Sequence, residues 1–198
     1  SYALHGTISN TPAEYVYYTI KNDVISINSI IKDHVIFGRK FTLIRTLNIP
    51  LFSNTFSITD TITNEGSADE PLMLLYHINL GYPLIDENSQ LLINSSKVVA
   101  RDAEAEKGIN EWNHIISPTP NYNEQCFYHF YDNENACMSV YNPSVHKGIS
   151  INFNTTEFPQ SVEWKMMGEH DYVLGLEPCT SLLDGRHTIR KNRNLNYL

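Results

Sequence analysis

Two titratable residues of this chain stand at the ends of stretches that otherwise predict buried β-strands. His77 follows the run Leu74-Leu75-Tyr76, and Glu177 follows the run Leu174-Gly175-Leu176. A titratable side chain in such a place is costly unless it is paired or used. An imidazole and a carboxyl that face one hollow form a couple able to transfer protons near neutral pH. We therefore predict His77 and Glu177 as the catalytic residues.

Each of the two residues also has a plainer interpretation, which the sequence leaves open. His77 could be a core histidine bonded to its neighbours, and Glu177 an exposed carboxylate at a strand end. The sequence context favours the functional interpretation, because Asn79 and the segment Gly81-Tyr82-Pro83 end the strand near a loop-lined rim. Apolar residues before Glu177 and Pro178 after it indicate an inward side chain, whose burial would raise its proton affinity.

Further residues are candidates for holding a polar ligand. We expect Asn79 to lie beside His77, Trp164 to stack on a sugar ring and Lys165 to donate to hydroxyls. His5 stands beside Gly6, which lets the backbone approach a ligand closely. The alternatives are a half-buried tryptophan with a solvated lysine, and a disordered chain start for His5.

Two arginines, Arg45 and Arg186, could clamp a polar ligand. Arg45 also fits a cross-strand surface charge, and Arg186 fits a turn. The acidic residues Asp102, Glu104 and Glu106 predict a solvated surface. No ordered set of histidines and carboxylates has metal-ligand spacing, so we predict neither a metal nor a cofactor.

The composition limits the possible partners. The chain has 198 residues, 41% of them hydrophobic, and a formal net charge of -8. This charge argues against a nucleic-acid partner and against an anionic membrane surface, and no apolar run is long enough to span a membrane. An odd number of cysteines, 3 in all, predicts reduced thiols in a cytoplasmic protein. The oligomeric state stays open.

Period-two alternation of apolar residues dominates the chain and predicts strands throughout. The segment 95–123 is expected to be a long ordered loop with a helical turn near 103–107. A succession of short strands with little helix predicts an all-β fold, an antiparallel sandwich formed by residues 1–198 as a single domain. The expected strands cover residues 14–20, 24–31, 41–49, 55–63, 72–78, 126–131, 136–141, 148–153, 161–167 and 172–176.

Four segments, in this order, resemble the DUF4432 branch of the aldose 1-epimerase (galactose mutarotase-like) superfamily. The resemblance implies a β-supersandwich that is truncated at both ends here, because family members carry further strands before and after these segments. The segments are Leu4-His5-Gly6-Thr7-Ile8-Ser9-Asn10-Thr11-Pro12-Ala13, Pro71-Leu72-Met73-Leu74-Leu75-Tyr76-His77-Ile78-Asn79-Leu80-Gly81-Tyr82-Pro83, Trp164-Lys165-Met166-Met167-Gly168 and Gly175-Leu176-Glu177-Pro178.

The same resemblance implies roles for these residues. His77 matches the mutarotase histidine that acts as acid, Glu177 matches the glutamate that acts as base, and His5 resembles a histidine that holds sugar hydroxyls. Trp164 and Lys165 match a DUF4432 motif rather than a mutarotase one. Two features depart from the mutarotase pattern: Ile78-Asn79 follows the histidine directly in place of Tyr-Phe-Asn, and the sugar-gripping aspartate has no assigned counterpart.

The sequence leaves three functions open. The first is interconversion of sugar anomers by the His77–Glu177 pair without a cofactor. The second is carbohydrate binding without catalysis, and the third is epimerisation or isomerisation of a modified sugar. The two arginines leave a phosphorylated or acidic sugar open, although the net negative charge does not favour one.

Overall fold

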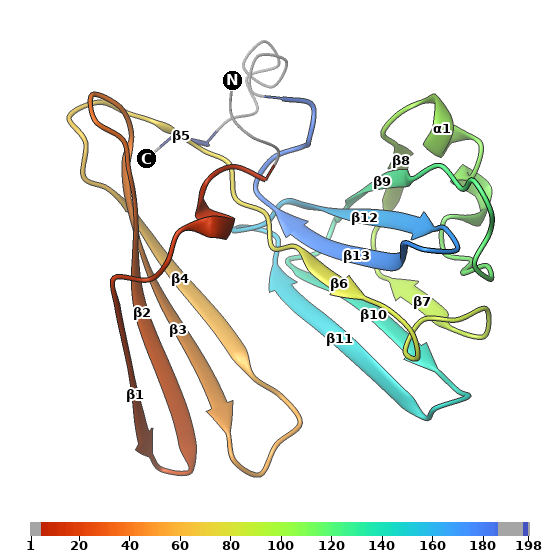
Figure 1. Cartoon of the computed structure of the whole chain (residues 1–198), viewed down its shortest axis with the longest axis horizontal. Helices are drawn as coiled ribbons and strands as arrows, with labels where there is room; N and C mark the ends of the chain where they lie inside the picture. The colour runs from red at the N-terminus through yellow and green to blue at the C-terminus, as the bar shows by residue number, and fades with distance from the viewer. Residues whose placement is uncertain (1–4, 186–195, 198) are drawn as a thin grey trace. The chain divides into compact units, whose positions relative to one another are not determined.

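The computed structural model describes residues 5–185 and 196–197, and they form an all-β fold with antiparallel sheets (Figure 1). The described residues fall into two compact units. The first unit contains the residues up to Pro71 together with Tyr197, and the second contains Leu72–Asn196. The all-β prediction is confirmed, and the single-domain organisation stays a prediction.

The first unit holds a four-stranded antiparallel meander, preceded by the short 3-10 helix η1 (Ile8–Asn10). Asn22 and Asp23 join its first two strands with φ angles of 51° and 59°. Residues of this type tolerate the left-handed conformation that tight hairpins require. The strands follow one another in the order β1 (Tyr15–Lys21), β2 (Val24–His34), β3 (Lys40–Pro50) and β4 (Ser57–Asn64).

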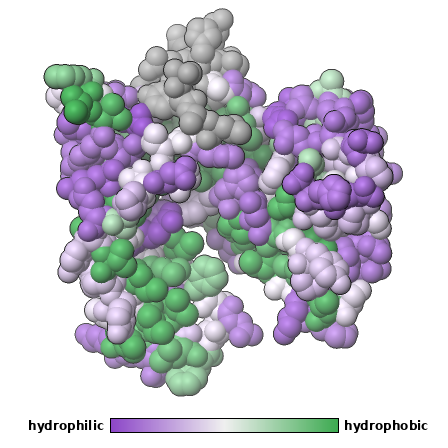
Figure 2. All heavy atoms as spheres, viewed as in Figure 1, coloured by the Kyte–Doolittle hydropathy of each residue, from purple (hydrophilic) through white to green (hydrophobic). Residues whose placement is uncertain are grey.

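The alternation of side chains gives this meander two unlike faces. The register pairs Ile27 with Leu47 on one face, and Asn28 with Thr46 on the other. Across the polar face, Thr46 donates to Asn28 at 2.9 Å. Several large side chains of β1 remain exposed, and Figure 2 shows hydrophobic surface over this sheet.

The second unit consists of two antiparallel sheets. The five-stranded sheet has the order β6-β13-β12-β9-β8, and the three-stranded sheet has the order β11-β10-β7. Their strands are β6 (Ile78–Leu80), β7 (Gln90–Ile93), β8 (Lys97–Ala100), β9 (Gln125–Phe130), β10 (Asn135–Asn142), β11 (Lys147–Asn154), β12 (Gln160–Met167) and β13 (Tyr172–Cys179). The remaining short strands β5 (Pro71–Leu72) and β14 (Asn196–Tyr197) pair with each other.

The two sides of the five-stranded sheet have different surroundings. One side, the core face, packs Leu174, Leu176 and Met167 against Met138 and Val140 of the three-stranded sheet. The other side, the site face, carries a smaller apolar cluster of Cys126, Tyr128, Val162 and Cys179. A strand residue and its sequence neighbour therefore reach different environments.

Most predicted strands are confirmed to within a few residues, and two differences stand out. Residues 72–78 do not form one continuous buried strand, because this segment is the edge of its sheet and Met73 and His77 are exposed. The strands β7 and β8 were not predicted, and their four-residue length leaves little periodicity to detect. The expected helical turn is confirmed as α1 (Ala103–Glu106), which is followed by η2 (Ile109–Glu111).

Asp102 is exposed, as predicted for the acidic surface, and it also has a local structural role. Its side chain is the N-cap of α1 and accepts hydrogen bonds from the backbone of Glu104 and Ala105. Within residues 5–185 and 196–197, no helix has the length and apolar character needed to cross a membrane.

Candidate functional site

Strand pairing brings His77 and Glu177 together although a hundred positions separate them in sequence. β6 and β13 pair with Asn79 opposite Gly175 and with Ile78 opposite Leu176. A bridge between Leu75 and Cys179 continues the same register beyond the strand end. His77 therefore stands opposite Glu177, on the same side of the sheet.

The two side chains meet at ion-pair distance. His77 Nε2 lies 3.2 Å from Glu177 Oε1, and the side chains are 29% and 3% exposed. Oε1 is buried and accepts no hydrogen bond from the described residues, so this contact has ion-pair distance without hydrogen-bond alignment. The imidazole thus reaches solvent, while the carboxylate behind it keeps an unused acceptor atom.

Burial gives Glu177 an unusual proton affinity. Removal from water, with a smaller contribution from the negative charge of Glu124, raises its pKa to about 7. Glu177 shares the site face with the apolar cluster, and its Oε1 accepts no hydrogen bond from the described residues. A carboxyl group with this pKa can both accept and release a proton near neutral pH.

Gly175 makes room for this arrangement. It lies opposite Trp164 in the register of β12 and β13. A Cβ atom at Gly175 would come within 2.5 Å of Glu177 Oε1 and within 3.2 Å of Trp164. The missing side chain therefore allows the carboxylate and the indole to lie close together.

Trp164 forms an aromatic wall beside the pair. Its ring centroid lies 5.6 Å from that of His77, with an angle of 78° between the ring planes. Its indole Nε1–H donates to Glu124 Oε2 at 2.8 Å. The orientation of the indole is thus set at one end by the imidazole and at the other by a carboxylate.

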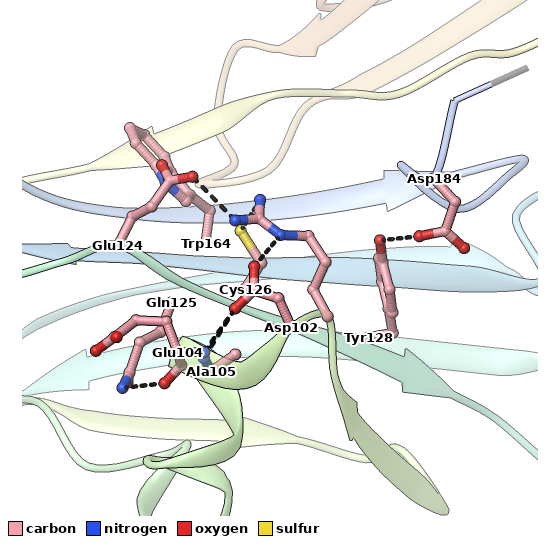
Figure 3. Close-up of polar contacts among 10 residues, drawn as sticks. Asp102, Glu104, Ala105, Glu124, Gln125, Cys126, Tyr128, Trp164 and Asp184 are labelled. Carbon is pink, nitrogen blue, oxygen red and sulfur yellow. Dashed lines mark hydrogen bonds and ion pairs between the residues drawn. The ribbon is translucent and has the colours of Figure 1, made fainter.

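A chain of charged contacts continues from Glu124 (Figure 3). Arg101 donates to Glu124 Oε1 at 3.0 Å, to Cys126 Sγ at 2.8 Å and to Asp102 Oδ2 at 2.8 Å. The hydrogen bonds from Trp164 and Arg101 lower the pKa of Glu124. Glu124 is therefore an ionised carboxylate near Glu177, held in place from two sides.

Asn79 and His5 are placed in different units. Asn79 is an exposed residue of β6 opposite Gly175, on the same side of the sheet as Glu177. His5 belongs to the first unit, where it is exposed in a turn with a φ angle of 66°. The structure thus gathers His77, Asn79, Trp164 and Glu177 on one face of one sheet.

Lys165 lies on the core face, away from its neighbour Trp164. Its ammonium group donates to the backbone carbonyls of Glu111, Trp112 and His114 at 3.2, 3.0 and 2.8 Å. The residue is 4% exposed, and burial lowers its pKa. These contacts make Lys165 an anchor for the loop around η2 and leave its ammonium no further hydrogen.

Of the two predicted arginines, the structure describes Arg45. Arg45, in β3 of the first unit, forms a two-fold hydrogen-bonded ion pair with Asp60 across the strands, at 2.8 and 2.6 Å. This contact matches the cross-strand charge that was the alternative interpretation of Arg45. Arg186 lies outside the described residues.

Sequence reasoning missed Arg101 and Glu124. Forty positions separate Glu124 from Trp164, and each residue stands in an ordinary polar or strand-flanking context. No local spacing could have connected them. Only the register that places Cys126 opposite Trp164 brings the two segments together.

The chemistry available on the site face is proton transfer combined with stacking on an aromatic ring. The ion pair offers one acid and one base, and the indole offers an apolar surface beside them. Within residues 5–185 and 196–197, no three histidine, cysteine, aspartate or glutamate side chains form a group able to hold a metal ion.

Comparisons with known proteins identify the family and the fold of the chain. The model of the DUF4432 family, a domain of unknown function, matches residues 1–198. The crystal structure of a putative aldose 1-epimerase from Klebsiella pneumoniae subsp. pneumoniae MGH 78578 is similar, with a TM-score of 0.93 and 28% identity. The match covers 100% of this chain and 53% of that one, so the chain spans about half of that protein. No curated protein matches the chain.

Proposed function

Because the chain belongs to the DUF4432 family and shares the all-β, galactose mutarotase-like fold of the Klebsiella structure, we propose that it interconverts the anomers of an aldose. The observation that carries the proposal is the 3.2 Å contact between His77 Nε2 and Glu177 Oε1. One partner reaches solvent, and the other holds a pKa of about 7. Proton exchange at a sugar needs such a pair.

The reaction follows from the positions of the sugar oxygens. The ring oxygen and the anomeric hydroxyl are bonded to the same carbon, so neighbouring acid and base groups can each reach one of them. Glu177 takes the proton of the anomeric hydroxyl while protonated His77 gives its proton to the ring oxygen. The bond between C1 and the ring oxygen then breaks and leaves an open-chain aldehyde. Rotation about the C1–C2 bond and the reverse steps give the other anomer.

The neighbouring side chains would bind the sugar. The indole of Trp164 offers a flat apolar surface to the C–H groups of a sugar ring. Asn79 offers both a donor and an acceptor to hydroxyl groups from the same face. The role of His5, which belongs to the first unit, stays a prediction from its sequence motif.

The proposal is tested by following mutarotation by polarimetry or by saturation-transfer NMR with a panel of aldoses. Each proton-transfer partner is typically worth about 10²- to 10⁴-fold in rate. We expect His77→Asn and Glu177→Gln each to lower the rate by an amount in this range, with circular dichroism unchanged. Wild-type rates that persist in both folded variants would refute the assignment.

Sugar binding without catalysis is the second candidate. It is favoured by the low exposure of Glu177, whose side chain is only 3% exposed. Saturable binding with anomerisation no faster than in buffer would support it. If only a modified sugar reacts, and it changes at a carbon other than C1, the protein is an epimerase or isomerase instead.

A further inference from the structure

The chain of contacts from Arg101 through Glu124 to Trp164 has no role in the proton transfers described above. All three side chains lie on or beside the site face, and none belongs to the His77–Glu177 pair. Their contacts are short, between 2.8 and 3.0 Å, and they link three separate segments of the second unit. Such a linked set restricts how the indole can move.

The geometry of Trp164 depends on this set. A tryptophan ring attached to a strand can rotate about two side-chain bonds, so packing alone leaves several orientations. Here Glu124 binds the Nε1–H edge, and the missing side chain at Gly175 leaves room beside the indole, where a Cβ would lie 3.2 Å from Trp164 Cε3. Glu124 is itself held by Arg101, whose other nitrogens are bound to Cys126 and to the N-cap residue Asp102 (Figure 3).

We propose that Glu124 is a positioning residue that fixes the indole of Trp164 as the wall against which the sugar ring binds. Arg101 supports Glu124 in this role. The inference rests on the proposed function for the identity of the ligand. It adds that ligand affinity depends on a residue that need not itself contact the sugar.

Glu124 also affects the base through its charge. The titratable and charged groups around this part of the site face are His77, Arg101, Asp102, Glu124, Cys126, Tyr128, Glu177, Cys179 and Asp184. Among them, Glu124 raises the pKa of Glu177, because a second negative charge nearby disfavours ionisation. Removal of its charge should therefore extend activity to lower pH, an effect that a merely structural residue would not produce.

The test compares Glu124→Ala with Glu124→Gln. Alanine removes the acceptor of the indole hydrogen bond, whereas the amide oxygen of glutamine can still accept it. We expect Glu124→Ala to raise the KM for the sugar about tenfold with kcat within about threefold, since a misplaced binding surface costs affinity. Glu124→Gln should recover most of this KM and move the acid limb of the pH–rate profile to lower pH.

A matched control is available in Glu134, which like Glu124 is exposed and immediately precedes a strand. Glu134→Gln should change neither KM nor the pH profile. Unchanged KM in Glu124→Ala, or equal losses in the alanine and glutamine variants, would overturn the proposal. An acid limb of Glu124→Gln that stays in place would also contradict it.

A second measurement separates this inference from the proposed function. The chain has 2 tryptophans, so the indole N–H signals in NMR spectra are assigned with Trp112→Phe. Titration with the sugar should move the Trp164 signal in wild type, with about tenfold weaker binding in Glu124→Ala. Binding of this kind without anomerisation would refute the mutarotase assignment and still support the role of Glu124. A Trp164 signal that does not respond to sugar would overturn the inference.

Discussion

The two faces of the five-stranded sheet each carry a histidine–glutamate pair. On the site face, His77 Nε2 lies 3.2 Å from Glu177 Oε1, and on the core face His129 Nε2 lies 3.2 Å from Glu163 Oε2. The residue types and the distances are the same. The exposed fractions differ, because the His77 side chain is 29% exposed and both members of the second pair are 0% exposed.

The surroundings explain why one pair suits chemistry and the other suits structure. His129 is enclosed by a hydrogen-bonding contact between its Nδ1 and Ser95, by the edge of Trp112 at a centroid distance of 5.0 Å, and by Glu163. Burial raises the pKa of both Glu163 and Glu177. A raised pKa therefore does not identify an active site by itself. The two pairs differ in access for a ligand, because the His77 side chain is partly exposed and His129 and Glu163 are fully buried.

The largest expected effect compares the two glutamates directly. Glu177→Gln should lower the anomerisation rate by about 10²- to 10⁴-fold, because the base is lost. Glu163→Gln should leave the rate per folded molecule within about threefold, because this carboxylate touches no reacting group. Mutarotation rates of both variants, scaled by the folded fraction from circular dichroism, give the comparison. Similar losses in both variants would remove the distinction between the two faces.

A second prediction concerns the neighbours Trp164 and Lys165, which point to opposite faces. Lys165→Met should lower the free energy of unfolding by about 4 kcal/mol, because three backbone carbonyls lose the donor that they share and the hydrogen bonds of a buried ammonium group are lost. Trp164→Phe should cost only about 1 kcal/mol, since the ring is kept and one hydrogen bond is lost. Urea unfolding measures both values.

The control for Lys165→Met is Lys107→Met. The Lys107 side chain is 68% exposed, and its ion pair with Glu104 lies on the surface. This variant should change stability by less than about 0.5 kcal/mol. If Lys107→Met and Lys165→Met had equal effects, the loop around η2 would not depend on the buried ammonium group.

The pH dependence of stability gives a third prediction. The pKa of Glu177 rises from 4.5 to about 7 on folding, so the folded state favours the protonated carboxyl. The stability contributed by this protonation is complete below pH 4.5 and is lost as pH rises through about 7. Glu177→Gln, which cannot ionise, should match wild type near pH 4 and be more stable by about 3 kcal/mol above pH 8.

Unfolding of wild type and Glu177→Gln in urea at several pH values checks this prediction. A stability difference that does not change between pH 4 and pH 9 would show that the carboxyl is not strained by burial. The same titration also affects activity, since the base must be ionised. We therefore expect the rate to fall as pH drops through about 7.

The smallest expected effect concerns the segment that supports Arg101. Asp102→Ala removes the N-cap of α1 and should lower the free energy of unfolding by about 1 kcal/mol. Because Arg101 also binds Glu124 and Cys126, we expect KM to rise by no more than about twofold. Thermal unfolding and mutarotation kinetics measure the two effects. A KM increase as large as that of Glu124→Ala would show that Asp102 is the main support of the contacts that link Arg101, Glu124 and Trp164.

The sequence predicted most strands, because most of them are six or more residues long and leave a detectable pattern. It could not predict β7 and β8, which are four residues long, nor the interrupted edge segment before His77. In that segment Leu74 and Leu75 look like a buried strand in the sequence. Their position at the sheet edge leaves them only partly buried.

The candidate site was only partly predictable for a related reason. His77 and Glu177 were found because each interrupts an apolar run. Lys165 was grouped with Trp164 because the two are adjacent in sequence, although strand geometry sends adjacent side chains to opposite faces. Glu124 gave no signal, since its partners Trp164 and Arg101 come from distant segments.

The alternation of Trp164 and Lys165 in β12 also guards against misfolding. A shift of this strand by one position would turn the ammonium group out of the interior and force the indole in, so an incorrectly aligned sheet would lack both its loop anchor and the indole on its site face. Any molecule with the Trp164 indole on the site face must therefore also have Lys165 in the interior. Correct packing of the core face is therefore a precondition for the arrangement of side chains on the site face.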